Sequence, residues 1–423
     1  MAETMNPIAG TSLDLEVFPV ELVDTIFQHM SADKSTIATC TLVSQSWRDM
    51  AVPHLFRSVE GVQQTALCDF GDFLDAHPRI ARCIQTLRLS GNLDSLPAPL
   101  CLREVFFTNT STDPFTTPMT GAAASPRRLE QLSVSTCFDE WKPTVAISPP
   151  ALICILQSFP ADAVSMCLLT VADIPSSDPR MANVSNPTHR LRIRELNLAH
   201  LSSCRRSDYD LRHLYYALRR VLAPGCLQSL RTRVGIDTAA DHESMRSFGK
   251  LVHFSAETLL ELGLPFALRH PVDALEDTPD YWRILRLHEC HRLRSFTIWI
   301  DPPLLRSLST ARGTPNRQHI PLSTMIIAIL DHLPPTLRTL TLAFCDGVEP
   351  AHIKNRKLGL GLLDNVLSET RFSSLEMVKI VLAEEYDYEP PVNFDECSQA
   401  ARETMPKCQQ RGILIVELEA ASM

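Results

Sequence analysis

The sequence predicts an α/β protein, with a small three-helix segment at its N-terminus followed by a longer array of alternating strands and helices. Two observations predict this fold. An apolar stripe at helical spacing occupies residues 18–30, and an apolar motif with strand-like alternation recurs between residues 84 and 418. We expect the helical segment to span residues 14–60 and the array to span residues 61–423. Units of this kind stack into a solenoid with a parallel sheet.

The N-terminal segment is predicted to form three short helices. In the first helix, Phe18, Leu22 and Ile26 recur every four residues, which places their side chains on one face. Asp33 and Ser44 are expected to cap the second and third helices. Three helices of this size bury little apolar surface, so the excess of apolar residues indicates an interface. The alternative is that these residues form the core of a helical cap on the array.

Two runs in this segment resemble an F-box of the form common in fungal proteins: FPVELVDTIFQHM at 18–30 and TCTLVSQSWRDMAVPHLF at 39–56. F-box proteins dock through these helices on the Skp adaptor, which bridges to a cullin scaffold. The resemblance implies that Phe18 and Pro19 stand at the family's Leu-Pro position, with Phe in place of the commoner Leu. It implies adaptor contacts from six further residues: Leu22, Ile26, Phe27, Leu42, Val43 and Trp47.

After residue 80 the chain repeats the pattern L-x-x-L-x-L, as in Leu259/Leu262/Leu264 and Leu337/Leu340/Leu342. The second and third apolar positions alternate as in a strand with one buried face. Predicted helices lie between the strands, for example at 211–222 and 322–333. The same pattern predicts strands around Met166/Leu169/Val171 and around Ile413/Val416/Leu418, and a helix from Phe394 precedes the last of them.

This pattern resembles leucine-rich repeats. The Asn or Cys that the family places three residues after the last apolar position is present as Asn92, Cys137 and Cys345. The repeats are unevenly spaced, and segments rich in Pro, Ser and Thr at 108–126, 173–190 and 301–321 account for much of the irregularity. The resemblance therefore implies an irregular, bent leucine-rich-repeat-like solenoid.

In such arrays the residues between the apolar positions face solvent on the inner side of the sheet. Large aromatic residues and Arg at such positions are typical of binding surfaces. The residues of this kind that we expect to contact a protein substrate are Phe106, Arg231, Arg233, Trp299 and Phe344. The alternative for Trp299 and Phe344 is ordinary packing under the flanking loops.

Composition and charge narrow the possible partners and compartments. Apolar residues make up 45% and charged residues 21% of the chain, and the net charge is −9. No run of Lys or Arg is long enough to follow a phosphate backbone, so neither nucleic acid nor an anionic membrane is an expected partner. The 13 cysteines include no C-x-x-C pair, and the first 17 residues hold no continuous apolar stretch. We therefore expect a reducing compartment, the cytoplasm or the nucleus.

Motifs for catalysis or metal binding are weak. The run from His288 to His291, HECH, has no second Cys/His pair at a zinc-finger spacing. Gly359-Leu-Gly361 begins neither a Walker motif nor G-x-G-x-x-G, and no G-x-S-x-G occurs. We expect no catalytic residue, metal or cofactor.

Together, the two resemblances imply a non-catalytic substrate-recognition subunit of a Skp–cullin–F-box ubiquitin ligase. The helices would hold the adaptor, and the array would tether a protein substrate for ubiquitination. Two alternatives stay open. One is a repeat-based interaction scaffold that acts without a cullin, and the other is a hydrolase or metalloenzyme, for which the sequence shows no nucleophile or ligand cluster.

Overall fold

The computed structural model describes residues 19–30, 33–63, 73, 76–90, 104–108, 129–135, 146–167, 170–171, 190–199, 202–203, 211–232, 242–266, 281–300, 322–344, 348–356, 358–384 and 393–420. The chain divides into two compact units, residues 1–89 with 95–105 and residues 90–94 with 106–423. The predicted boundary between residues 60 and 61 lies inside the first unit and stays a prediction.

The first unit begins with three helices, α1 (Val20–His29), α2 (Lys34–Cys40) and α3 (Gln45–Leu55). Both α1 and α2 pack against α3. The elements that follow are β1 (Ser58–Gln63), α5 (Pro78–Cys83), β2 (Thr86–Ser90) and β3 (Glu104–Thr108), and the boundary between the units falls within the last two.

The two predicted helix caps are confirmed. The Asp33 carboxylate accepts a hydrogen bond from the Thr36 backbone N–H at 3.0 Å. The Ser44 hydroxyl oxygen accepts one from the Trp47 backbone N–H at 3.2 Å. Hydrogen bonds from the Thr36 side chain and backbone also lower the pKa of Asp33 below its ordinary value. Pro53 lies inside α3, which continues to Leu55.

The second unit contains a nine-strand parallel sheet, which confirms the α/β class. Each strand pairs with the next one in chain order. The strands are β4 (Leu129–Ser135), β6 (Ala161–Cys167), β8 (Glu195–Ala199), β10 (Ser229–Thr232), β11 (Glu261–Phe266), β12 (Ser295–Ile300), β13 (Thr339–Phe344), β14 (Met377–Glu384) and β15 (Leu414–Ala420).

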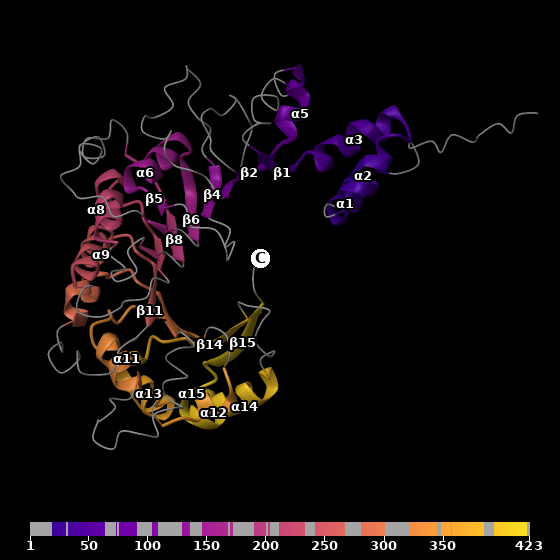
Figure 1. Ribbon diagram of the computed structural model, residues 1–423. Coiled ribbons are helices and arrows are strands. Elements are labelled where there is room, and N and C mark those ends of the chain that lie inside the picture. The colour runs from indigo at the N-terminus through magenta and orange to yellow at the C-terminus, as the bar shows by residue number, and fades with distance from the viewer. Residues whose placement is uncertain are drawn as a thin grey trace, which may run out of the picture. The chain divides into compact units, whose positions relative to one another are not determined.

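Helical segments connect these strands and lie along the outer side of the curved sheet (Figure 1). They are α6 (Pro149–Ser158), α8 (Arg212–Val221), α9 (His242–Phe254), η4 (Tyr281–Leu285), η5 (Leu287–Glu289), α11 (Leu322–Leu330), α12 (Pro350–Ile353), α13 (Leu360–Leu367), η6 (Thr370–Phe372), α14 (Phe394–Thr404) and α15 (Pro406–Gln410). The helices predicted at 211–222 and from Phe394 are confirmed, and the helix predicted at 322–333 forms but ends at Leu330. A second sheet consists of β5 (Ala146–Ile147), β7 (Thr170–Val171) and β9 (Ser202–Ser203), which are also parallel.

The apolar repeat sets the register of the large sheet. The second apolar positions of successive units pair directly across the strands, as Leu196 with Leu230 and Leu230 with Leu262. The series continues through Phe296, Leu340 and Val378. All of these side chains are buried, so each strand contributes the same layer to one continuous core.

Two predicted registers are wrong. The strand expected around Met166/Leu169/Val171 is β6, and its buried residues are Ala161, Val164 and Met166. Ala161 occupies the first apolar position, and because alanine is small, the predicted register of this strand lies five residues too late. In β15, Leu414 pairs with Val378 and Val416 pairs with Ile380, so this strand lies two residues out of the expected alignment. Period-two alternation does not distinguish registers that differ by two residues.

Repeated polar contacts join the beginning of each strand to the unit before it. The Arg338 carbonyl, for example, accepts backbone hydrogen bonds from both Glu376 and Met377, at 2.8 and 3.0 Å. A Ser or Thr directly before three of the repeat leucines also donates its side-chain hydroxyl to a backbone carbonyl of the preceding unit. These bonds run from Thr258 to Leu227, from Thr336 to Leu293 and from Ser374 to Leu337.

A buried carboxylate holds the last helix. Asp364 on α13 is 2% exposed. Its two carboxylate oxygens accept the backbone N–H groups of Lys407, at 3.0 Å, and Cys408, at 2.8 Å. Helix α15 begins with Pro406, which has no N–H, so Asp364 satisfies the next two donors of the first turn.

The Pro/Ser/Thr-rich segments at 108–126, 173–190 and 301–321 lie almost entirely outside the described residues. Asn92, Cys137 and Cys345, the proposed markers of the repeat, also lie outside them.

Candidate functional site

The helices α1 to α3 enclose a small core. Val23, Phe27, Ile37 and Ala51 are buried in it, and Trp47 packs partly against them. The Phe27 and Trp47 rings meet edge to face, with centroids 5.8 Å apart. His54 on α3 joins this core to α1, because its Nε2 lies 2.7 Å from the Asp24 carboxylate. Phe27 is therefore a structural residue and offers no surface for docking, and Trp47 offers little.

Four of the predicted adaptor-contacting side chains are exposed. Leu22 and Ile26, one helical turn apart on α1, are 49% and 45% exposed. Leu42 and Val43, in the turn between α2 and α3, are 77% and 62% exposed. Pro19, directly before α1, is also exposed, and Phe18 lies outside the described residues. We call Leu22, Ile26, Leu42 and Val43 the exposed apolar set.

The predicted substrate-contacting residues on the large sheet differ in placement. Arg231 on β10 is exposed on the face opposite the helices. Trp299 on β12 points to the same face but is only 8% exposed. Phe344 is fully buried, contrary to expectation. The reason is parity, because Phe344 shares the inward face of β13 with Leu340 and Leu342. Arg233 and the side chain of Phe106 lie outside the described residues.

Trp299 belongs to a small apolar cluster with Ala343 and Val381, which neighbour it on the same face in β13 and β14. On its other side, Gly263 leaves room for the indole. A Cβ atom at Gly263 would lie 3.4 Å from Trp299 Nε1 and 3.4 Å from the Cγ of Arg231. The missing side chain thus lets Arg231 and Trp299 approach each other across β11.

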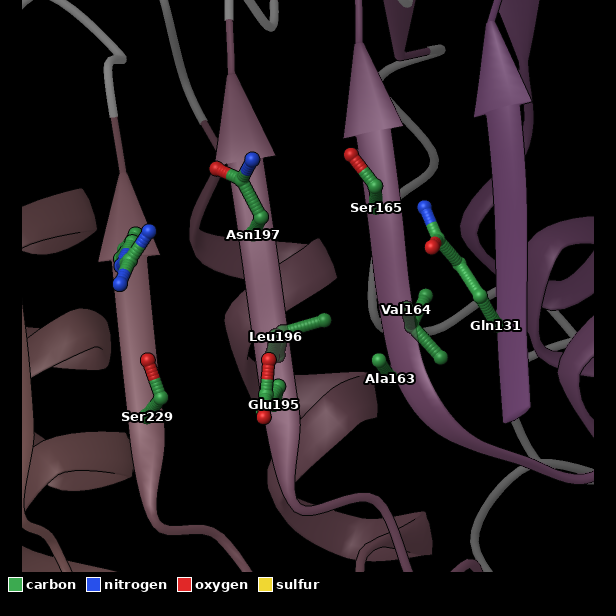
Figure 2. A pocket seen from close by; sticks show the side chains of 9 residues that line it. Gln131, Ala163, Val164, Ser165, Glu195, Leu196, Asn197 and Ser229 are labelled. Carbon is green, nitrogen blue, oxygen red and sulfur yellow. The ribbon is translucent and has the colours of Figure 1, made fainter. Parts of the chain in front are cut away.

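A polar pocket of about 180 Å³ lies on this face across β4, β6, β8 and β10 (Figure 2). The polar side chains that line it are Gln131, Ser165, Glu195, Asn197, Ser229 and Arg231. The sequence analysis did not single out this pocket. Its signal in the sequence is modest, because it consists of polar residues at alternate positions of several strands, with the small residues Ala163, Ser165 and Ser229 among them.

Ion pairing distributes charge unevenly around this pocket. Arg231 donates a hydrogen bond to Glu261 Oε2 at 2.8 Å, and the Ser229 hydroxyl donates to the same oxygen at 3.2 Å. In the described part of the chain, the side chains of Glu195 and Asn197 have no hydrogen-bond partner. Among its described lining residues, the pocket therefore contains a carboxylate without a partner, Glu195, and a cation that is already paired, Arg231.

In the run from His288 to His291, Glu289 and Cys290 are held in place by contacts within the protein. Glu289 forms ion pairs with His253 of α9 and with Arg286, and Cys290 is buried. Burial tends to raise the pKa of Glu289, but the hydrogen bond with His253 and the nearby charges of His253 and Arg286 outweigh it and lower the pKa. Among the described residues, no three His, Cys, Asp or Glu side chains are grouped so as to hold a metal ion.

The described helices include none with the length and apolar character needed to cross a bilayer. Comparison of the chain with models of known protein families and with curated proteins finds no match.

Proposed function

We propose that this protein is the substrate-recognition subunit of a Skp–cullin–F-box ubiquitin ligase. In this proposal α1 to α3 form an F-box that docks on the Skp adaptor. The strand–helix array is an irregular leucine-rich-repeat solenoid that holds a protein substrate. The in-register series of buried apolar residues from Leu196 to Val378 supports the repeat assignment.

The observation that carries the proposal is the exposed apolar set. Val23 and Phe27 on α1 are buried, so the three helices already have a core without Leu22, Ile26, Leu42 or Val43. Burying a large aliphatic side chain in an interface contributes about 1.5–3 kcal/mol. Four such residues on so small a helical unit are more typical of a docking surface than of an idle one.

The test uses a double variant, Leu22→Arg with Leu42→Arg. Both side chains are exposed, so the substitutions leave the core of α1 to α3 intact. Trp47 is unsuitable for this purpose because it packs against Phe27. The matched control is Leu362→Arg on α13 in the second unit, where Leu362 is 50% exposed.

The assay is co-purification of the Skp adaptor and the cullin with the full chain. We expect the wild type and Leu362→Arg to retain both proteins. The double variant should lose both, with adaptor affinity reduced at least about 100-fold, because two apolar contacts of about 1.5 kcal/mol each are replaced by buried charges. Equal adaptor binding by the double variant and the wild type would show that this surface is not the docking site. Retention of the adaptor without the cullin would favour an interaction scaffold instead.

A further inference from the structure

The pocket across β4, β6, β8 and β10 has a shape set by the side chains that surround it. Asn197 pairs with Ser165 on β6 and with Arg231 on β10, so it occupies the middle of the pocket. Glu195 lies two residues earlier on the same strand, between Ala163 and Ser229. Ala163 and Ser229, the neighbours of Glu195, are both small and leave its carboxylate accessible, and Ser165 leaves space on one side of the Asn197 amide. Figure 2 shows Gln131 on the β4 side of this hollow.

The charges on the whole face favour a cationic ligand. The described cations of the nine strands on this face are Arg231 and Lys379. Arg231 is paired with Glu261 at 2.8 Å, and Lys379 with Glu417 at 3.1 Å. Glu195 has no such partner among the described residues. An anionic ligand would have to displace Glu261 from Arg231, whereas a cation can pair with Glu195 directly.

The groups at the pocket floor also suit one particular cation. The Glu195 carboxylate, the Asn197 amide oxygen and the Ser165 hydroxyl oxygen are hydrogen-bond acceptors on two adjacent strands. A guanidinium group offers five donors in a planar fork and binds a carboxylate through two parallel hydrogen bonds. A lysine ammonium group is a compact point charge without that fork.

We propose that this pocket binds an arginine side chain of the partner protein, with Glu195 as its counter-ion and Asn197 and Ser165 as further acceptors. The inference rests on the proposed receptor function, since it assigns a chemical feature to the substrate that the array would hold. It also places the centre of recognition on β6 and β8, away from Trp299 and Phe344.

The probe is the peptide amide Gly-Ser-Gly-Arg-Gly-Ser-Gly, and its partner peptide carries citrulline, the neutral isostere of arginine. Binding to the full chain is followed by saturation-transfer difference NMR, which detects millimolar ligands. We expect the wild type to bind the arginine peptide about tenfold more tightly than the citrulline peptide. The factor lies at the low end of the range for a charged hydrogen bond because Glu195 is exposed and solvent screens the pair.

The deciding variant is Glu195→Gln, and the matched control is Glu419→Gln. Glu419 is an exposed carboxylate on the same face of β15, and it too has no partner among the described residues. Both variants change the net charge equally. Glu195→Gln should remove the preference for arginine, and Glu419→Gln should keep it. Equal loss in both variants would attribute binding to net charge and overturn the proposal, as would a wild type that does not distinguish the two peptides.

The outcome is separable from that of the proposed function. A chain that retains the Skp adaptor but shows no preference for arginine disproves the pocket assignment alone. A chain that shows the arginine preference but binds no adaptor disproves the F-box assignment alone. Far-UV circular dichroism of each variant establishes that the fold is retained.

Discussion

Replacing Asp364 by Ala should release helix α15 and the strand that follows it. Both carboxylate oxygens of Asp364 accept backbone N–H groups of the first turn of α15, at 3.0 and 2.8 Å. A hydrogen bond to a charged group contributes about 1.5–3 kcal/mol, and a typical helix cap contributes about 0.5–2 kcal/mol. Asp364 is 2% exposed, so water cannot easily take its place. We therefore expect a loss of about 3 kcal/mol.

The assay is amide hydrogen exchange of residues 406–420 in the full chain, read by mass spectrometry. A local measurement is needed because a chain of two units does not give one two-state transition. Asn365→Ala, an exposed neighbour on α13, is the control and should change protection by less than about 0.5 kcal/mol. If Asp364→Ala leaves the protection of α15 and β15 within that same range, the carboxylate does not anchor the helix and the reasoning is wrong.

Three further predictions concern single contacts in the array. Gly359→Ala should lower the hydrogen-exchange protection of α13 by more than about 1 kcal/mol, because φ is 68° and the new Cβ would overlap the Ser323 hydroxyl. Adding Ser323→Ala should restore only part of that protection, since the Cβ of residue 323 stays 2.9 Å away. Thr258→Val should lower the hydrogen-exchange protection of β11 by about 1 kcal/mol, because it removes the 2.8 Å bond to the Leu227 carbonyl. Burial, with Asp364 nearby, raises the pKa of Cys408 to about 12, so iodoacetamide at pH 8 should modify this thiol only after denaturation.

The strand pattern could be predicted where every apolar position carries a large side chain. Leu262 and Leu340 fall at the second position of their units in both the sequence pattern and the sheet. The prediction failed at β6, where Ala161 occupies the first position. An alanine at this position can pack against the neighbouring unit, but its small side chain contributes little to an apolar pattern in the sequence. Register could not be fixed in β15 either, since a shift of two residues preserves the alternation.

The candidate sites were predictable to different degrees. The exposure of Leu22 and Ile26 follows from helical periodicity, because Val23 and Phe27 already fill the inward face of α1. The inward position of Phe344 also follows from strand parity, but the aromatic side chain at a strand end suggested a surface role. The pocket around Glu195 depends on four neighbouring strands together, and on the pairing of Arg231 with Glu261. That pairing joins residues 30 positions apart, so it requires the register of the folded sheet.

The order of the strands has a mechanical consequence. Each of the nine strands pairs with the strands before and after it in that series, so a pull on β15 first meets the backbone hydrogen bonds that join it to β14, its strand partner among the described residues. Once β15 has detached, the load passes to α15, which the Asp364 carboxylate holds, and then through α14 to β14. A molecular motor that pulls on the chain from this end would therefore unfold the unit one element at a time. It would meet a series of small free-energy barriers to unfolding. A sheet whose chain ends lie in the middle would have to be sheared all at once.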